Sequence, residues 1–424
     1  MAAWFKTILY FPIAYYFRFF AGIQLKIWHP RVIVVTGSSG KTTLLHLIES
    51  QLRSQAKYSH HANSSYGIPF DILNLHRRSL TIIEWPGLFL LAPFRAFKKP
   101  YPQKIYIVEA DCDRPFEGKF LALLLRPEVT LWTSVSRTHS KNFDKLVKNK
   151  KYYSLEDAIA YEYGYFLEYT SDLSIVDGDS AFITKQLSRT TSQVKLATIA
   201  NHLQDYQVSL SQTRFKIDDK LYTFNFSLPR ETSYNIFMCL GLLAYLGHPV
   251  DDTFAHFYLP PGRSSVFPGV NDITIIDSSY NANLSSMEVI LEMFSRIPAQ
   301  TKWAVIGDML EQGAGEGYEH EQLAQIIAKL ELKKIILFGP RTSQYTFPQL
   351  QKMIGDKTDV QKFMNPREVL DYLQNTISGG EVILFKGARF LEGVIEHLLW
   401  DKNDAQKLAR REKVWQIRRK HWGL

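Results

Sequence analysis

The sequence has few cysteines, no long apolar run and no internal repeat. Its 424 residues include only two cysteines, Cys112 and Cys239, too few for a disulfide framework or a four-cysteine zinc site. Near the N-terminus, Lys6 and Arg18 bracket an uncharged run of only 11 residues. A membrane-spanning helix needs about 20, and no cleavage site of a secretory signal is evident. We therefore expect a cytoplasmic protein.

Acidic residues are missing from the first part of the chain. Residues 1–31 carry four Lys/Arg and no Asp or Glu, and residues 401–424 carry eight Lys/Arg against three acidic residues. The net charge is +8, so the remainder is nearly neutral. Aromatic residues interleave with the N-terminal cations, which favours a helix lying in the interface of an anionic membrane, on the cytoplasmic face. The alternative is a helix docked on the protein's own core. Nucleic-acid binding is not expected.

A glycine loop follows the first buried strand. Residues 32–35 are four apolar β-branched residues, and Thr36, Gly-Ser-Ser-Gly-Lys-Thr-Thr and an amphipathic helix start follow them. In such a loop, backbone N–H groups, the positive end of the helix and a lysine bind the polyphosphate of a nucleotide, and a threonine hydroxyl binds Mg²⁺. The residues expected to bind the nucleotide here are Gly37, Ser38, Ser39, Gly40, Lys41, Thr42 and Thr43.

Strands and helices alternate after residue 31, which predicts a parallel α/β sheet with ligands at the strand ends. The expected strands are 105–108, 129–133, 273–276, 303–306, 334–338 and 382–385, with a hairpin over 213–228 and a helix over 232–246. Pro260-Pro261-Gly262 is a candidate linker. The expected organisation is an N-terminal segment (1–30), a P-loop ATP-binding domain (31–258), a smaller Rossmann-like α/β domain (259–400) and a basic tail (401–424).

Further motifs follow the loop in a fixed order. They are residues 63–69, 108–110, 136–139, 234–236, 260–263, 277–283, 307–311 and 386–389. Only two residues separate Gly37 from Gly40, where the general P-loop has four. This shortened loop and the ordered motifs resemble the Mur ligases, the ATP-dependent amide-forming enzymes of peptidoglycan synthesis. The resemblance is closest to the branch that adds D-alanyl-D-alanine (MurF-like).

The resemblance implies a role for each matching residue. It implies catalysis by Lys41, Glu109 and His139, and Mg²⁺ binding by Thr42, Glu109 and His139. Asn235 would lie on the adenine side of ATP, and Arg263 and Asp277 would bind the nucleotide from the C-terminal domain. The residues expected to face the substrate are Tyr280, Asn281, Asn283, Lys386 and Arg389.

Two departures separate the sequence from that family. Only about thirty residues precede the P-loop strand, too few for the N-terminal domain that usually grips the UDP-sugar. In addition, Tyr163 stands where the family carries a lysine that becomes carbamylated, and a phenol with a pKa of about 10 cannot supply carbamate oxygens. Glu162 and Glu168 are candidate replacements, although Glu162 would require a rotation of its helix.

The leading hypothesis is an ATP-dependent carboxylate–amine ligase of the Mur type, acting through an acyl phosphate on a small carboxylate and an amine or dipeptide. It would use ATP and Mg²⁺ and act as a monomer or weak oligomer. The alternatives are a ligase of the same superfamily with a non-UDP substrate, such as a polyglutamate-type enzyme, and a membrane-attached nucleotide-binding pseudoenzyme.

Overall fold

The computed structural model describes residues 9–60, 62–77, 82–387 and 390–424. These residues fold into two compact units that alternate along the chain. The first unit comprises 1–136, 145–199 and 234–257, and the second comprises 137–144, 200–233 and 258–424. The domain boundaries expected from the sequence stay predictions.

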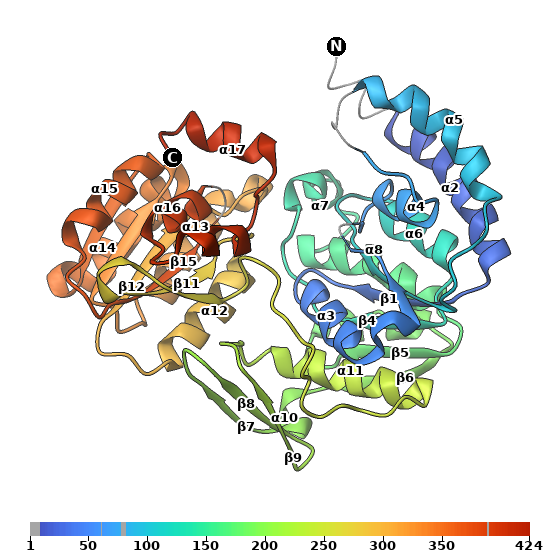
Figure 1. Ribbon diagram of the computed structural model, residues 1–424, viewed down its shortest axis with the longest axis horizontal. Helices are drawn as coiled ribbons and strands as arrows, with labels where there is room; N and C mark the ends of the chain where they lie inside the picture. Colours follow the sequence, from blue (N-terminus) through green and yellow to red (C-terminus); the bar gives the residue numbers. More distant parts are fainter. Residues whose placement is uncertain (1–8, 61, 78–81, 388–389) are drawn as a thin grey trace. The chain divides into compact units, whose positions relative to one another are not determined.

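The first unit is built on a sheet of six parallel strands in the order β2-β3-β1-β4-β5-β6 (Figure 1). The strands are β1 (Arg31–Thr36), β2 (Ala56–Tyr58), β3 (Ile105–Ala110), β4 (Val129–Trp132), β5 (Leu173–Asp177) and β6 (Gln193–Ala197). β1 and β4 are buried along almost their whole length, as expected for strands covered on both faces. This confirms the parallel α/β sheet predicted from the alternating pattern.

The helices of the first unit are α2 (Tyr10–Trp28), α3 (Lys41–Leu52), α4 (Gly67–Ile72), α5 (Trp85–Ala96), α6 (Glu117–Leu125), α8 (Leu155–Glu168), α9 (Ala181–Thr184) and α11 (Thr232–Leu246). α11 has the predicted bounds. α2 buries Phe17, Ala21 and Trp28 and packs against α4 and α5. The alternative of a helix docked on the protein's own core thus describes residues 10–28, while residues 1–8 lie outside the described part of the chain.

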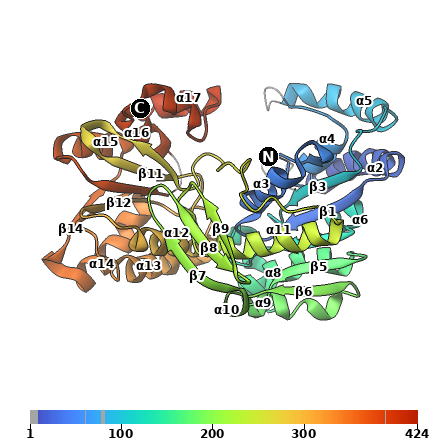
Figure 2. The same ribbon diagram turned by 60° about the horizontal axis from the view of Figure 1, so that its bottom comes forward.

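The second unit contains two sheets. The larger has the order β10-β11-β15-β12-β13-β14 and is parallel except for β10. Its strands are β10 (Ser265–Pro268), β11 (Thr274–Ser278), β12 (Lys302–Gly307), β13 (Lys334–Phe338), β14 (Asp359–Phe363) and β15 (Val382–Lys386). The other is the antiparallel sheet of β7 (Leu203–Val208), β8 (Thr213–Ile217) and β9 (Lys220–Phe224), whose strands lie side by side in Figure 2. The predicted hairpin forms β8 and β9, whereas β2, β5, β6, β7, β10 and β14 were not predicted.

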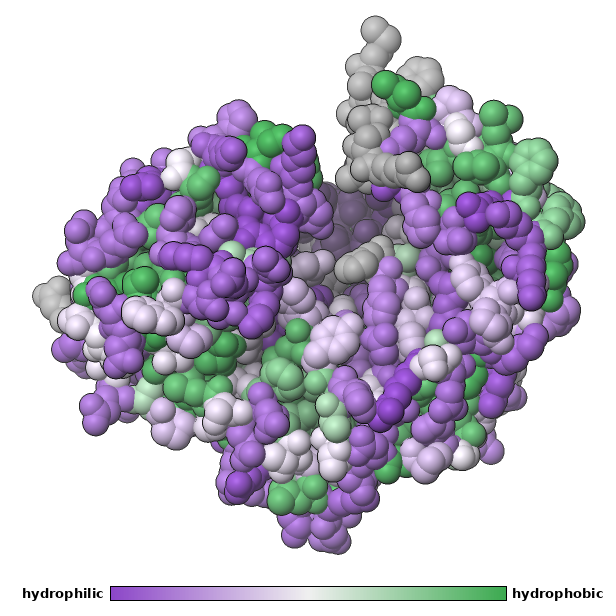
Figure 3. Space-filling view, in the orientation of Figure 1, coloured by the Kyte–Doolittle hydropathy of each residue, from purple (hydrophilic) through white to green (hydrophobic). Residues whose placement is uncertain are grey.

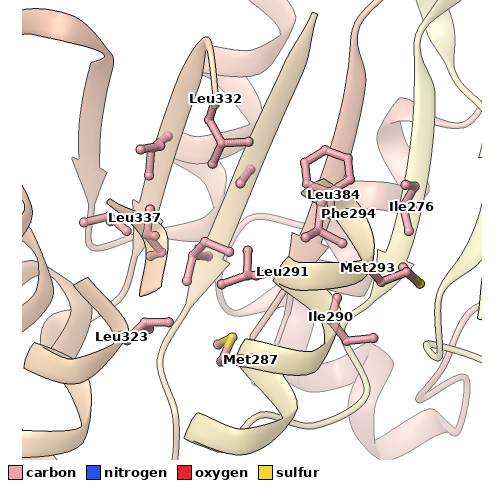
Figure 4. Packing of buried hydrophobic residues seen from close by; sticks show 14 of the residues in the cluster. Ile276, Met287, Ile290, Leu291, Met293, Phe294, Leu323, Leu332, Leu337 and Leu384 are labelled. Atoms are coloured by element: carbon pink, nitrogen blue, oxygen red, sulfur yellow. The ribbon is translucent and has the colours of Figure 1, made fainter. Parts of the chain in front are cut away.

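The helices of the second unit are α12 (Leu284–Arg296), α13 (Glu316–Ile327), α14 (Phe347–Ile354), α15 (Pro366–Thr376), α16 (Leu391–Leu398) and α17 (Lys413–Lys420). The short helices α7 (Asp144–Lys148) and α10 (Ile199–His202) lie where the chain passes from one unit to the other. Figure 4 shows Leu291 and Phe294 of α12 beside Leu337 and Leu384 of the sheet. This packing fixes α12, and with it the loop that precedes the helix.

None of the helices in the described ranges has both the length and the apolar character needed to span a bilayer.

Candidate functional site

The glycine loop lies between the end of β1 and the start of α3. Gly37 has φ 126° and Gly40 has φ 86°, a region that L side chains rarely adopt. A Cβ on Gly37 would lie 2.5 Å from Thr133 Oγ1 and 2.8 Å from the Ser134 backbone nitrogen. The backbone approach therefore requires glycine, and the loop presents the N-terminus of α3 with Lys41 as its first residue.

Residues that follow β4 form hydrogen bonds with the glycine loop. Ser39 donates its backbone N–H to Ser134 Oγ at 2.8 Å, and Ser38 Oγ donates to the Ser136 carbonyl at 3.0 Å. Asn235 of α11 donates from Nδ2 to the Gly40 carbonyl at 3.3 Å. Ser134 was not predicted as part of the site. Its position directly after a buried strand adjacent to β1 was the available signal.

Lys41 is buried and held by two partners. Its Nζ donates to the Gly37 carbonyl and lies 3.0 Å from Asp111 Oδ2. Burial by itself would lower the pKa of this lysine, but Asp111 and Glu109 outweigh burial and raise it. Lys41 therefore carries its positive charge at neutral pH, as an anion-binding residue must.

Tyr163 reaches the same place from α8. Its hydroxyl donates to Asp111 Oδ1 at 2.6 Å and lies 3.1 Å from the Gly37 carbonyl. Burial, followed by the Asp111 charge, raises the pKa of Tyr163 well above its ordinary value. The phenol is thus a neutral donor that fixes Asp111 against Lys41.

The two glutamates considered as replacements for the carbamate have other partners. Glu162 is buried, and its two oxygens accept from the backbone N–H groups of Phe116 and Gly118. Glu168 pairs with Arg189 at 2.8 Å. Desolvation raises the pKa of Glu162 to about 7.

Two of the three predicted metal ligands belong to the first unit, and within it they lie together. Thr42 Oγ1 donates to Glu109 Oε2 at 3.0 Å, beside the loop and at the carboxyl end of β3. His139 belongs to the second unit, where its Nδ1 lies 2.7 Å from Glu311 Oε2. Lys141 donates to the other oxygen of Glu311 at 2.8 Å. Burial raises the pKa of Glu311, but Lys141 and His139 outweigh it and lower the value.

A second cluster lies at the ends of β11 and β15 in the second unit. Asp277 is fully buried, and its Oδ1 accepts from the backbone N–H and hydroxyl of Ser279 at 2.9 and 2.6 Å. Its Oδ2 has no hydrogen-bond partner among the described residues. Burial raises the pKa of Asp277. A buried carboxylate oxygen without a partner is suited to a ligand hydroxyl or cation.

Lys386 and Arg263 complete this cluster. Lys386 Nζ donates to the Asn281 carbonyl, and the guanidinium of Arg263 lies over the Tyr280 ring at 4.3 Å. Burial first, then repulsion from Arg263, lowers the pKa of Lys386 to about 7, while Asp277 acts in the opposite direction.

Asn283 and Arg389 were also predicted to face the substrate. Asn283 caps α12, because its side chain accepts from the Ser286 backbone N–H and Ser286 returns the interaction in a capping box. Arg389 lies outside the described residues.

The basic C-terminal tail is packed on the second unit. Arg410 and Arg419 lie 3.4 and 3.5 Å from the carboxylate of Glu392, which is fully buried in α16. Arg410 also donates to the backbone carbonyls of Ser279 and Tyr280. The tail therefore supports the loop after β11, a contact that the sequence analysis missed because charge alone does not reveal a buried partner.

Together these features define a class of protein. A short glycine loop with a charged, buried lysine at the end of a parallel sheet, followed by a second α/β unit, is the arrangement of a P-loop nucleotide-binding protein with an added domain.

The chain is similar to known ligases in both its sequence and its C-terminal segment. Residues 262–389 match the model for the Mur ligase glutamate ligase domain. The UDP-N-acetylmuramoyl-tripeptide–D-alanyl-D-alanine ligase of Rickettsia prowazekii is 25% identical over 301 residues, covering 67% of this chain and 63% of that protein. The Bacillus subtilis ligase of the same name is 23% identical over 385 residues, covering 87% of this chain and 76% of that protein. Residues 262–389 thus match a Mur ligase domain, and the chain is similar to D-alanyl-D-alanine ligases over 67% and 87% of its length in these two comparisons.

A solved structure supports the fold over both units. The MurF ligase of Thermotoga maritima, in complex with ADP, superimposes with a TM-score of 0.71 at 22% identity, covering 93% of this chain and 84% of that one. The predicted fold class and the resemblance to MurF-like ligases are confirmed.

Proposed function

We propose that this protein is an ATP-dependent carboxylate–amine ligase of peptidoglycan precursor synthesis, of the D-alanyl-D-alanine-adding type. The observation that carries the proposal is the charged, buried Lys41 in the glycine loop, in a chain that also contains a Mur ligase C-terminal segment.

The residues of the loop fit a nucleotide triphosphate. The left-handed glycines leave a cradle that a Cβ on Gly37 would fill, and the α3 N-terminus and Lys41 favour an anion. We assign the phosphates to residues 37–43 and the adenine side to Asn235. Arg263 and Asp277 are assigned to the nucleotide because a cation and a buried carboxylate with an unpaired oxygen suit phosphate and hydroxyl groups.

Thr42 and Glu109 fit a magnesium ion, because a hydroxyl and a carboxylate 3.0 Å apart are hard oxygen ligands. His139 is assigned as a further ligand from the family resemblance. When bound, the ion would neutralise charge on the transferring phosphoryl group.

In the proposed reaction, a carboxylate oxygen of the first substrate forms a bond to the γ-phosphorus of ATP, and the bond to the β,γ-bridging oxygen breaks. This gives an acyl phosphate and ADP. The amine of the second substrate then attacks the acyl carbon, phosphate leaves, and the amine loses a proton to form the amide. Lys41 stabilises the charge that develops on the transferring group.

The substrate side of the proposal involves Tyr280, Asn281, Asn283, Lys386 and Arg389. Partners are a small carboxylate and an amine or dipeptide, with no nucleic acid, and the protein acts as a monomer or weak oligomer. We further propose that it works in the cytoplasm as a peripheral protein on the inner face of the membrane, because residues 1–31 carry four cations and no acidic residue.

The test is phosphate release from ATP with Mg²⁺, UDP-N-acetylmuramoyl-tripeptide and D-alanyl-D-alanine. We expect release that depends on both substrates. Release with a polyglutamate-type substrate pair only would support the nearest alternative. Tight ATP binding without turnover on any pair would support the pseudoenzyme and contradict a ligase.

A further inference from the structure

Helix α5 is apolar on two opposite faces. Leu88, Ala92 and Ala96 recur at i, i+4 and i+8 and are buried, and α5 packs on α2. Leu90, Phe94 and Phe97 recur at i, i+4 and i+7, and they are 70%, 72% and 69% exposed. A helix that is apolar on all faces is normally buried on all faces. We therefore expect the exposed face of α5 to lie against an apolar partner.

The exposed residues are large and adjacent. Leu91, 47% exposed, widens the stripe formed by Leu90, Phe94 and Phe97. Hydrophobic surface is visible in Figure 3 along the edge of the first unit where Figure 1 places α2 and α5. Contiguous apolar patches of this kind mark sites for proteins or membranes, whereas single exposed apolar residues do not.

The charge around α5 has one sign. Residues 85–104 contain Arg95, Lys98, Lys99 and Lys104 and no acidic residue, and residues 9–30 contain Arg18 and Lys26 and no acidic residue. Lys98 and Lys99 are exposed directly after the apolar stripe. An apolar stripe flanked by cations is complementary to an anionic bilayer, in which the apolar side chains enter the interface and the cations lie near the headgroups.

The acidic side chains near α5 interact with other residues and do not neutralise the charge of these cations. Asp71 pairs with Lys57, and Glu117 is fully buried, where it accepts from Ser65, Asp113 and Tyr10. Glu84, at the start of α5, lies 3.8 Å from Arg77.

We propose that Leu90, Leu91, Phe94, Phe97, Lys98 and Lys99, here called the α5 surface, form a docking site for an anionic lipid bilayer. The α5 surface lies parallel to the membrane and enters it only at the interface. The proposal rests on the peripheral location proposed above, and it assigns that location to an internal helix of the P-loop unit in place of residues 1–8.

The first test is co-sedimentation of the full chain with vesicles of phosphatidylcholine, with and without about 30% phosphatidylglycerol. We expect binding that is at least about tenfold tighter to the anionic vesicles. L90Q/F94Q/F97Q should weaken binding by about tenfold or more, and K98E/K99E should remove the preference for anionic lipid.

Matched controls change equally exposed residues elsewhere. L221Q/W400Q alters side chains that are 57% and 73% exposed in the second unit, and K148E/K150E reverses two exposed lysines. Both control variants should bind vesicles within twofold of the unchanged protein. Each variant's far-ultraviolet circular dichroism establishes that it is folded.

A second readout locates the contact. F94W should be quenched by vesicles that carry brominated acyl chains, and L221W should not.

Binding that is unaffected by L90Q/F94Q/F97Q, or that disappears only when residues 1–8 are deleted, would overturn the proposal. So would a dimer that L90Q/F94Q/F97Q dissociates while no form binds vesicles, because a second copy would then cover α5. If the protein binds vesicles as expected but shows no ligase activity, the proposed enzyme function is contradicted and the α5 surface remains supported.

Discussion

Lys41 and Lys386 are two buried lysines with opposite surroundings. Lys41 follows the glycine loop of the first unit and faces Asp111 and Glu109, which raise its pKa. Lys386 ends β15 of the second unit, near Arg263, and its pKa falls to about 7. Burial disfavours the charged form of both side chains, so the neighbouring charges decide the result. The first lysine is a fixed cation, and the second changes charge near neutral pH.

The largest effect is expected where the fixed cation is removed. K41A should lower substrate-dependent phosphate release by about a thousandfold, because the charge that stabilises the transferring phosphoryl group is lost. Steady-state phosphate release measures this. K57A, which removes a partly buried lysine of the same unit from its pair with Asp71, is the control for loss of stability. Equal losses in K41A and K57A would contradict a specific role for Lys41.

Removing the carboxylate that balances Lys41 tests why the two lysines differ. D111N should destabilise the protein by about 3 kcal/mol, because breaking a buried pair leaves an uncompensated charge. Y163F, which removes only the hydrogen bond to Asp111, should cost about 1 kcal/mol. The urea midpoint of the fluorescence transition measures both. A Y163F loss as large as that of D111N would mean that the phenol, rather than the lysine, is the main partner of Asp111.

The pH dependence of stability separates the two lysines further. The folded pKa of Lys386, about 7, lies below its ordinary value of 10.5. Between these pH values the unfolded chain holds a proton that the folded protein lacks, so stability rises as pH increases from 7 toward 10.5. Relative to K386M, the unchanged protein should therefore be more stable at pH 9 than at pH 6.5 in urea denaturation. Parallel profiles of the two proteins would refute the lowered pKa.

The smallest expected effect is a loss of stability from a change in the loop that precedes α12. The Asn281 carbonyl of this loop accepts a hydrogen bond from Lys386. N283A should cost about 1 kcal/mol through loss of the α12 cap, and N365A, which removes the cap of α15, should cost a similar amount. Thermal unfolding measures both. If N283A also raises the KM for substrate and N365A does not, Asn283 has a binding role in addition to capping.

Much of the fold was predictable because local pattern and tertiary structure agree. The continuous apolar run before Gly37 predicted β1, and the apolar stretch over 232–246 predicted α11 with its observed bounds. β7 was missed because its residues are mostly exposed and polar, so that its pairing with β8 is the only signal. The outward face of α5 was missed because an apolar run gives no information on which residues the rest of the fold covers.

Candidate site residues could be predicted where they belong to a sequence motif. They could not be predicted where only a tertiary contact brings them into the site. Gly37 and Lys41 were predicted from the glycine loop and Glu109 from the family resemblance, and their roles in binding stay predictions. The hydrogen bond between Tyr163 and Asp111 joins residues from α8 and the loop after β3, and spacing cannot predict a contact that the sheet creates. The predicted ligands Thr42 and Glu109 contact each other within the first unit, and His139 contacts Glu311 within the second unit.

The tail of the chain has a consequence for how the protein is handled. Arg410 and Arg419 compensate the buried Glu392, and Arg410 also holds the carbonyls of Ser279 and Tyr280. A protease that removed the last fifteen residues would leave a buried carboxylate unbalanced and release the loop next to Asp277. Limited digestion from the C-terminus would then be an early sign of inactivation, and an affinity tag is better fused elsewhere.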